Sequence, residues 1–300
     1  AGEMIGRVSQ AASNATGIAP GIPVIACGSD KGCETLGAGV AGPDMVNLSF
    51  GTTATVQTVS NRYFETLPLL PPYPSPMPGY YNPEVEILRG FWMISWFKDQ
   101  FAHKEVAEAD ALGVPPEQLL DQCLERTSPG AMGLMVQPYW GPGLASPGAK
   151  GAMIGFGDVH DRNHVYRAVI EGLAFALLEG REKIEKKSRI RVQKAVVSGG
   201  ASQSGQICQI AADIFNLPMI RGNTHETSGL GAAMITATGV GIYPDIAAAA
   251  RHMIQTETVF DPVPAHAALY RQLYDRVYKK MYPALSPLYA QIRKITGYPG

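Results

Sequence analysis

Cysteine is scarce in this sequence of 300 residues, charge of one sign is not in excess, and long apolar runs are missing. The four cysteines form no Cys-x-x-Cys pair, so they lack the spacing of a zinc ribbon, and they are too few for a disulfide scaffold. We therefore expect buried thiols in a protein of a reducing compartment, the cytoplasm. Lys and Arg number 25 against 26 Asp and Glu, and the formal charge of -1 disfavours nucleic-acid and anionic membrane partners.

Signals for secretion and membrane insertion are missing as well. The N-terminal stretch AGEMIGRVSQAA has no basic start followed by an apolar run, so it predicts no secretory signal. The longest uncharged stretch, from Thr227 to Pro244, is rich in Gly, Ala and Thr and falls short of the roughly 20 apolar residues of a spanning helix. It predicts a tightly packed helix in a soluble protein. Because the chain begins with Ala1 rather than Met, we expect a fragment.

The composition is that of a folded globular protein, with 46% apolar and 17% charged residues. Strand and helix patterns alternate along the chain without an evident repeat, which predicts an α/β fold with a mixed sheet flanked by helices. A buried strand is expected at 21–29, two strands joined by a tight turn at 45–58, and further strands at 133–140, 194–198 and 218–221. Helices are expected at 31–39, 91–110, 116–125, 163–187, 204–215, 228–238, 245–254 and in the C-terminal tail.

Two further stretches have a clear structural interpretation. Residues 67–83 contain seven prolines, which prevent a helix or a central strand, so we expect a surface loop inside an insertion at about 62–90. The tail carries tyrosines at 270, 274, 278 and 282, four residues apart on one helical face, which indicates packing rather than chemistry. Both stretches could also form contacts in a homodimer.

Several motif-like patterns do not meet the context that their chemistry requires. The GAGVAG run at 37–42 matches the glycine pattern of dinucleotide-binding loops, but it ends a helix rather than joining a strand to one, so we expect close packing and a C-cap. His160 and His164 have metal-ligand spacing without a third ligand nearby, and His225-Glu226 lacks the second histidine of a zinc protease helix. No metal-binding residue is predicted.

Three loops remain as candidates for chemistry, each with a purely structural alternative. Asp30 ends the first strand, where open α/β sheets bind ligands, although it could simply cap the following helix. The FGTTAT turn at 50–55 could offer N–H and hydroxyl groups to a phosphate, or be an ordinary hairpin. The stretch VVSGGASQSGQ at 196–206 predicts a strand, paired glycines and a helix N-terminus, which together favour an anion.

In this order, the three loops resemble the C-terminal domain of the FGGY carbohydrate kinases, members of the actin-like ATPase superfamily with an RNase H-like core. The stretch from 151 to 175 is similar to that family's C-terminal signature, and the resemblance runs from about residue 20 to the end. The residues that match the signature are Gly151, Met153, Gly155, His164, Val165, Ala168, Val169, Ile170 and Glu171, whereas Phe156 departs from it.

The resemblance implies a role for each loop. Asp30 matches the catalytic base that takes the proton from the sugar hydroxyl, and phosphoryl transfer needs one such carboxylate besides positioning and charge stabilisation. The residues expected to bind ATP are Gly51, Thr52 and Thr53 at the phosphates, and Gly199, Gly200, Ala201 and Ser204 at the adenosine. Ser95 and Trp96 match a weaker segment on the nucleotide side. The implied cofactors are ATP and Mg²⁺, and the substrate is a sugar or polyol.

The resemblance also implies a second domain. Family members carry an earlier sugar-binding domain with an Asp-x-Gly-Thr phosphate loop, and no such loop occurs here. We therefore expect residues 1–300 to be the ATP-side domain, with this missing N-terminal domain as its partner and little activity alone. A non-catalytic actin-like nucleotide-binding module remains the alternative, and an interaction domain whose glycine loops are merely turns is a third possibility.

Overall fold

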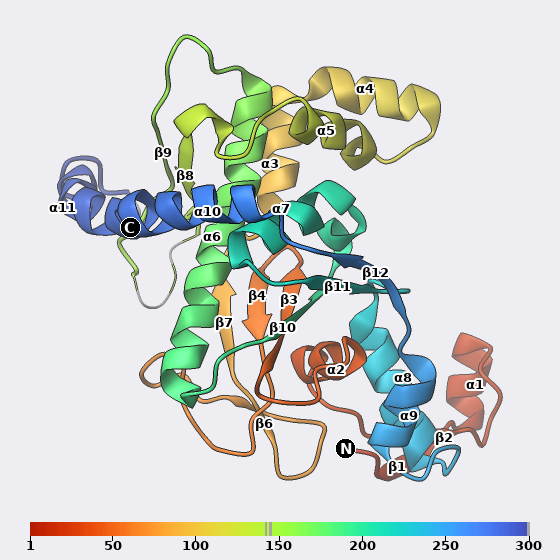
Figure 1. Cartoon of the computed structure of the whole chain (residues 1–300). Helices are drawn as coiled ribbons and strands as arrows, with labels where there is room; N and C mark the ends of the chain where they lie inside the picture. Colours follow the sequence, from red (N-terminus) through yellow and green to blue (C-terminus); the bar gives the residue numbers. More distant parts are fainter. Residues whose placement is uncertain (142, 144–145, 299–300) are drawn as a thin grey trace.

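A six-stranded mixed sheet lies at the centre of the computed structural model, which describes residues 1–141, 143 and 146–298 (Figure 1). The strand order is β12-β11-β10-β3-β4-β7; neighbours among β3, β10 and β11 run parallel, whereas β4, β7 and β12 each pair antiparallel. The strands are β3 (Met45–Phe50), β4 (Ala54–Gln57), β7 (Glu84–Ile87), β10 (Lys194–Ser198), β11 (Met219–Gly222) and β12 (Thr256–Phe260). The expected mixed α/β sheet is confirmed.

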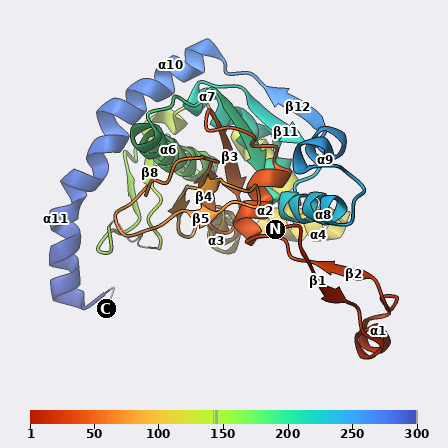
Figure 2. The ribbon, with the colours of Figure 1, turned by 90° about the horizontal axis from the view of Figure 1, so that it is seen from below.

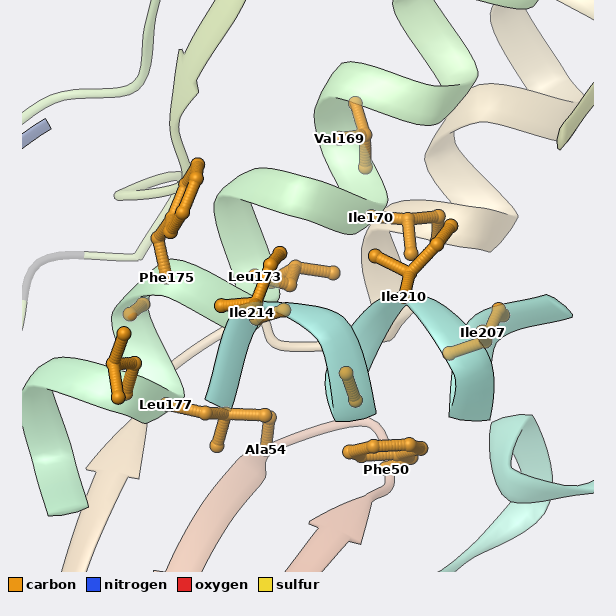
Figure 3. Packing of buried hydrophobic residues seen from close by; sticks show 14 of the residues in the cluster. Phe50, Ala54, Val169, Ile170, Leu173, Phe175, Leu177, Ile207, Ile210 and Ile214 are labelled. Atoms are coloured by element: carbon orange, nitrogen blue, oxygen red, sulfur yellow. The ribbon is translucent and has the colours of Figure 1, made fainter. Parts of the chain in front are cut away.

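One face of this sheet is apolar and is covered by α6 (Arg162–Ser188) and α7 (Gly205–Phe215). Alternate residues of a strand point to opposite faces, so every second residue of β3, β4 and β10 enters this core. Figure 3 shows Phe50 and Ala54 facing Leu177 and Ile214 of the two helices. The helices predicted at 163–187 and 204–215 are confirmed, because long apolar periodicity identifies a buried helix reliably.

The opposite face of the sheet is polar although it is buried. Its side chains come from the other alternate positions: Asn47, Ser49, Thr55, Gln57 and Ser198. Hydrogen bonds join this layer to α2 (Asp30–Gly37), on which α8 (Thr227–Gly239) packs in turn, followed by α9 (Ile246–Met253). The helix that carries Asp30 is thus held to the sheet by hydrogen bonds as well as by packing.

The contact between α2 and α8 explains the glycine run at 37–42. A Cβ on Gly37 would lie 2.0 Å from the Thr227 carbonyl oxygen, and one on Gly231 would lie 2.0 Å from that of Cys33. The glycines permit close packing, as predicted, although the C-cap itself is Ala38. The uncharged stretch from Thr227 is the expected packed helix. Among the described residues, none of the helices combines the length and the apolar character of a membrane span.

Helices and short strands complete the chain around the sheet. The helix predicted at 91–110 is divided at Ala102, which is the C-cap of one helix and the N-cap of the next. The hydrophobic pattern missed β7, β9 and β12, and residues 142, 144 and 145 of the predicted loop 141–150 lie outside the described residues. The remaining elements are α3 (Trp92–Phe101), α4 (His103–Leu112), α5 (Pro116–Glu125), β5 (Tyr73–Pro74), β6 (Tyr81–Asn82), β8 (Met135–Gln137), β9 (Ala152–Ile154), η1 (Ala131–Gly133) and η2 (Gly200–Gln203).

The C-terminal helices α10 (Pro264–Leu273) and α11 (Lys279–Thr296) are joined by a π-helical turn at Tyr274–Tyr278. Tyr270, Tyr274 and Tyr278 are buried around Phe175 of α6, with ring centroids 5.2–6.0 Å from it. The prediction that the tyrosine stripe is packing is confirmed for these three residues. Because they face the core, they are not available for a contact between two copies of the chain.

The strand predicted at 21–29 is the clearest error of the sequence analysis. β2 (Pro23–Ile25) is short and half-exposed, and it pairs with β1 (Met4–Arg7) rather than with the central sheet. With α1 (Gln10–Thr16) these strands form an arm that projects from the body (Figure 2). Ile5 on this arm is 67% exposed. The prediction of a buried strand was wrong, because an apolar run between Gly and Pro residues indicates a strand but not whether another element covers it.

Candidate functional site

A cavity of about 600 Å³ opens where the β3–β4 turn meets the loop between β10 and α7. The walls are completed by residues of α3 and α5 and by Tyr166 of α6. The predicted nucleotide residues that line it are Gly51, Thr52, Gly200, Ala201, Ser204 and Ser95. Two loops about 150 residues apart in the sequence therefore contribute to one cavity.

Gly199 brings the two loops into contact. Its φ of +81° is disfavoured for residues with a side chain, and a Cβ there would lie 2.9 Å from the carbonyl carbon of Phe50. The Gly199 N–H donates to the His225 carbonyl at 3.3 Å. Gly199 is thus a residue of close approach between β3 and β10, and it does not itself line the cavity.

The loop at 50–55 forms the predicted hairpin turn and is tied to α3. The Gly51 carbonyl accepts a hydrogen bond of 3.0 Å from the N–H of Phe91, and the Thr52 carbonyl accepts one of 3.5 Å from Trp92. These bonds turn the two carbonyl groups toward the helix. Thr53 lies in the same turn but is not among the described residues that line the cavity.

Ser204 begins α7 and contributes its side chain to the cavity wall. Its hydroxyl accepts a hydrogen bond from the N–H of Ile207 at 3.1 Å, so it is the N-cap of the helix. The same hydroxyl donates to Asp121 on α5 at 2.6 Å. The sequence analysis did not identify Asp121 as a site residue, because no local pattern relates positions 83 residues apart. Asp121 was predicted only as part of the helix at 116–125.

Asp30 lies outside this cavity, exposed at the start of α2. The N-cap is Ser29, whose hydroxyl accepts the N–H of Gly32 at 3.0 Å, so the structural alternative for Asp30 as the capping residue was wrong. The Asp30 carboxylate accepts only the N–H of Lys31, at 2.8 Å, among the described residues. Its carboxylate is therefore free to meet a hydroxyl group from outside the domain.

The other sequence candidates have structural roles in the described residues. His164 completes a capping box with Asp161 at the start of α6, with its ring 5.4 Å from that of His160. Glu171 accepts hydrogen bonds from the Tyr270 hydroxyl at 2.7 Å and from the Gly130 N–H at 2.9 Å. Trp96 packs against Trp140 at 5.2 Å. The C-terminal signature thus mainly supports the core.

The cysteines are free thiols, as expected. Cys33, Cys123 and Cys208 are buried and Cys27 is half-buried. No three His, Cys, Asp or Glu side chains of the described residues gather into a group that could hold a metal ion. Mg²⁺ in kinase sites is commonly held by one or two carboxylates together with the substrate phosphates, an arrangement that does not require such a group.

The model of the FGGY family of carbohydrate kinases, C-terminal domain, matches residues 46–240. The chain belongs to this family. The FGGY domain is 31% identical over 286 residues to an uncharacterized sugar kinase of Escherichia coli K12, covering 93% of this chain and 57% of that protein. It is 29% identical over 277 residues to a xylulose kinase of Lactococcus lactis, covering 90% and 53%.

Solved structures support the same fold for the FGGY domain. The xylulose kinase of Rhodospirillum rubrum superposes with a TM-score of 0.80 at 26% identity, covering 96% of this chain and 57% of that protein. The actin-like ATPase fold that the resemblance implied is therefore confirmed. The FGGY domain spans a little more than half the length of the relatives it matches.

Proposed function

We propose that this FGGY domain binds ATP in the cavity between the β3–β4 turn and α7 and serves an ATP-dependent sugar kinase. The observation that carries the proposal is that Gly51, Thr52, Gly200, Ala201 and Ser204 share one cavity. Backbone at the glycines allows the close approach of phosphates and ribose. The family membership and the names of the relatives, sugar kinase and xylulose kinase, support the same reaction.

In the proposed reaction, Asp30 accepts the proton of the attacking sugar hydroxyl while that oxygen forms a bond to the γ-phosphorus. The bond from the γ-phosphorus to the β–γ bridging oxygen breaks, and ADP leaves with the electron pair. Catalysis of this kind rests on positioning and on charge stabilisation, to which Mg²⁺ bound by the phosphates contributes. The Asp30 carboxylate is exposed and accepts one hydrogen bond from the described residues, so it can accept a proton from a substrate, as such a base requires.

We further propose that a sugar-binding domain covers the projecting arm of this domain. The arm exposes a group of apolar side chains, each 39–67% accessible: Met4, Ile5, Ile18, Ile22 and Val24. Apolar patches of this kind commonly mark an interface. The sugar would then lie between the two domains, beside Asp30, and its identity would be determined mainly by the partner domain. The Pro-rich insertion at about 62–90 belongs to the same proposal, although its last part is not at the surface: β7 (Glu84–Ile87) is an edge strand of the central sheet.

The test is sugar-dependent release of ADP by the full-length polypeptide in which this domain occurs, across ketoses, aldoses and polyols with xylulose included. Asp30→Asn should lower turnover by ~10²–10⁴, the usual contribution of a positioned base. Because Ser29 caps α2, the substitution leaves the helix cap intact. The matched control is Asp110→Asn on the exposed side of α4, which should retain full activity.

Two results would contradict the proposal. A loss of turnover of less than threefold in Asp30→Asn would show that Asp30 is not the base. ADP release at one slow rate regardless of sugar would favour a non-catalytic nucleotide-binding module of the same fold. The domain by itself should bind nucleotide weakly and turn over no sugar, since closure over the substrate requires the second domain.

A further inference from the structure

The Ser204 hydroxyl cannot donate a hydrogen bond to a ligand in this arrangement. A hydroxyl has one proton, and that of Ser204 is directed at the Asp121 carboxylate, 2.6 Å away. One lone pair of the same oxygen already accepts the N–H of Ile207 at 3.1 Å. What Ser204 still offers to the cavity is therefore an acceptor.

Asp121 offers acceptors as well. It is half-buried on α5 and lines the cavity, and among the described residues Ser204 is the donor to its carboxylate. Burial raises the pKa of Asp121, although the hydrogen bond from Ser204 opposes this, and the neighbouring Glu125 and Glu117 raise it further. A ligand N–H directed at the second carboxylate oxygen would stabilise the charged form.

The Asp121–Ser204 pair thus forms an acceptor-only patch in the wall of the nucleotide cavity. Phosphates are excluded from this patch, because two anionic groups would repel each other in a partly buried place. The patch lies at the start of α7, whereas the predicted phosphate end is at Gly51 and Thr52 of the other loop. A nucleobase that presents a hydrogen-bond donor fits it best.

We propose that Asp121 selects adenine among the nucleobases by accepting a hydrogen bond from its 6-amino group, with Ser204 holding the carboxylate in place. This inference rests on the proposed function, since it requires a nucleotide in the cavity. Hypoxanthine carries an oxygen where adenine carries the amino group, so two acceptors would face each other at that position, and its N1–H would reach the carboxylate only if the base shifted in the cavity. A purine without a 6-substituent would leave the carboxylate unpaired.

The experiment compares four nucleotides on the 300-residue chain by isothermal titration calorimetry, at one pH and one Mg²⁺ concentration. They are ADP, purine riboside 5′-diphosphate, IDP and GDP. ADP should bind about 10–100-fold more tightly than purine riboside 5′-diphosphate, which lacks the donor, the range of a hydrogen bond to a charged group. It should also bind more tightly than IDP and GDP, whose 6-oxygen would face the carboxylate. Guanine and hypoxanthine are the demanding competitors, because the N1–H of both and the 2-amino group of guanine are also donors to a carboxylate.

Asp121→Asn is the informative variant. Asparagine has the same shape, its carbonyl can still accept from Ser204, and its amide can now donate to the 6-oxygen of hypoxanthine. The preference for ADP over IDP should fall below threefold or reverse. Glu125→Gln is the matched control: it makes the same change one turn further along α5, where Glu125 accepts from Gln206 outside the cavity, and it should keep the ADP preference. Thermal unfolding of each variant shows that it is folded.

The outcomes separate this inference from the proposed function. Equal binding of all four nucleotides, tighter binding of GDP, or an ADP preference that survives in Asp121→Asn would overturn the role of Asp121 and leave nucleotide binding established. Because the isolated domain is expected to bind weakly, the same titration is made on the full-length polypeptide; failure of every nucleotide to bind there would overturn the proposed function, and the selection of adenine with it.

Discussion

The Glu34 carboxylate accepts a hydrogen bond of 2.9 Å from the Ser198 hydroxyl. This bond joins α2, which begins at Asp30, to β10, which leads into Gly199. Lys31 and Gln57 donate to the same carboxylate at 2.9 and 3.2 Å, and the group is buried. The proposed base and the nucleotide loop are thus positioned by one buried polar group beneath them.

Removal of this carboxylate should destabilise the domain. Glu34→Ala leaves the Ser198, Gln57 and Lys31 donors without their acceptor, and breaking a buried ionic network by one partner costs about 3–5 kcal/mol. Ser198→Ala removes one neutral donor and should cost only about 1 kcal/mol. Urea unfolding at pH 7 measures both. A loss below about 1 kcal/mol in Glu34→Ala would show that α2 is held by packing alone.

Paired variants can separate folding from nucleotide binding at the two glycines after β10. Gly199→Ala forces a side chain into a positive φ and against the Phe50 backbone, so it should lose about 2–4 kcal/mol of unfolding free energy. The added methyl group of Gly200→Ala would meet no atom of the described residues within 4 Å, so this variant should unfold like the parent. Because Gly200 lines the cavity, its methyl group should nevertheless weaken ADP binding. Equal stability of the two variants would contradict the close approach.

The packing of α2 on α8 leads to another paired prediction. A Cβ on Gly231 would lie 2.0 Å from the Cys33 carbonyl oxygen, a backbone atom that cannot move alone, so Gly231→Ala should cost about 3 kcal/mol or more. A Cβ on Gly229 of the same helix would meet no atom of the described residues within 4 Å, and Gly229→Ala should gain about 0.5–1 kcal/mol from helix propensity. Thermal denaturation should therefore shift in opposite directions for the two variants.

Glu84 should make the stability of the domain depend on pH. Burial, and to a smaller extent the nearby Glu86, raise the pKa of Glu84 from its ordinary value of 4.5 to about 7. Between these values the unfolded chain has lost the proton and the folded domain still holds it, so folding is increasingly penalised as pH rises and the full penalty is present above pH 7. Glu84→Gln removes that penalty.

The free energy of unfolding of Glu84→Gln should therefore exceed that of the parent by about 1–3 kcal/mol at pH 8 and by little at pH 5. Chemical denaturation at a series of pH values measures the difference. Glu86→Gln, at an exposed position of the same strand, removes only the smaller of the two effects that raise the pKa of Glu84. Its difference from the parent should therefore depend less on pH than that of Glu84→Gln. A difference that stays constant from pH 5 to pH 8 would refute the assignment.

Local patterns in the sequence predicted the elements that bury one apolar face. The hairpin β3–β4, the long helix α6 and the unit of β10 and α7 were all anticipated, because periodicity and glycine punctuation act within a few residues. The same patterns misassigned β2, since an apolar strand looks alike whether it joins a sheet or an exposed arm. They also missed β12, which owes its place to pairing with β11.

By itself the sequence determined the mixed α/β fold, the order of the three loops and the family, because each depends on residue types at short spacing. Only the tertiary structure decided that Gly51 and Gly200 share a cavity, that Ser29 rather than Asp30 caps α2, and that Asp121 meets Ser204. The physical reason is that hydrogen bonds and close contacts act over a few ångströms in space. Chain folding alone brings residues 83 or 150 positions apart within that range.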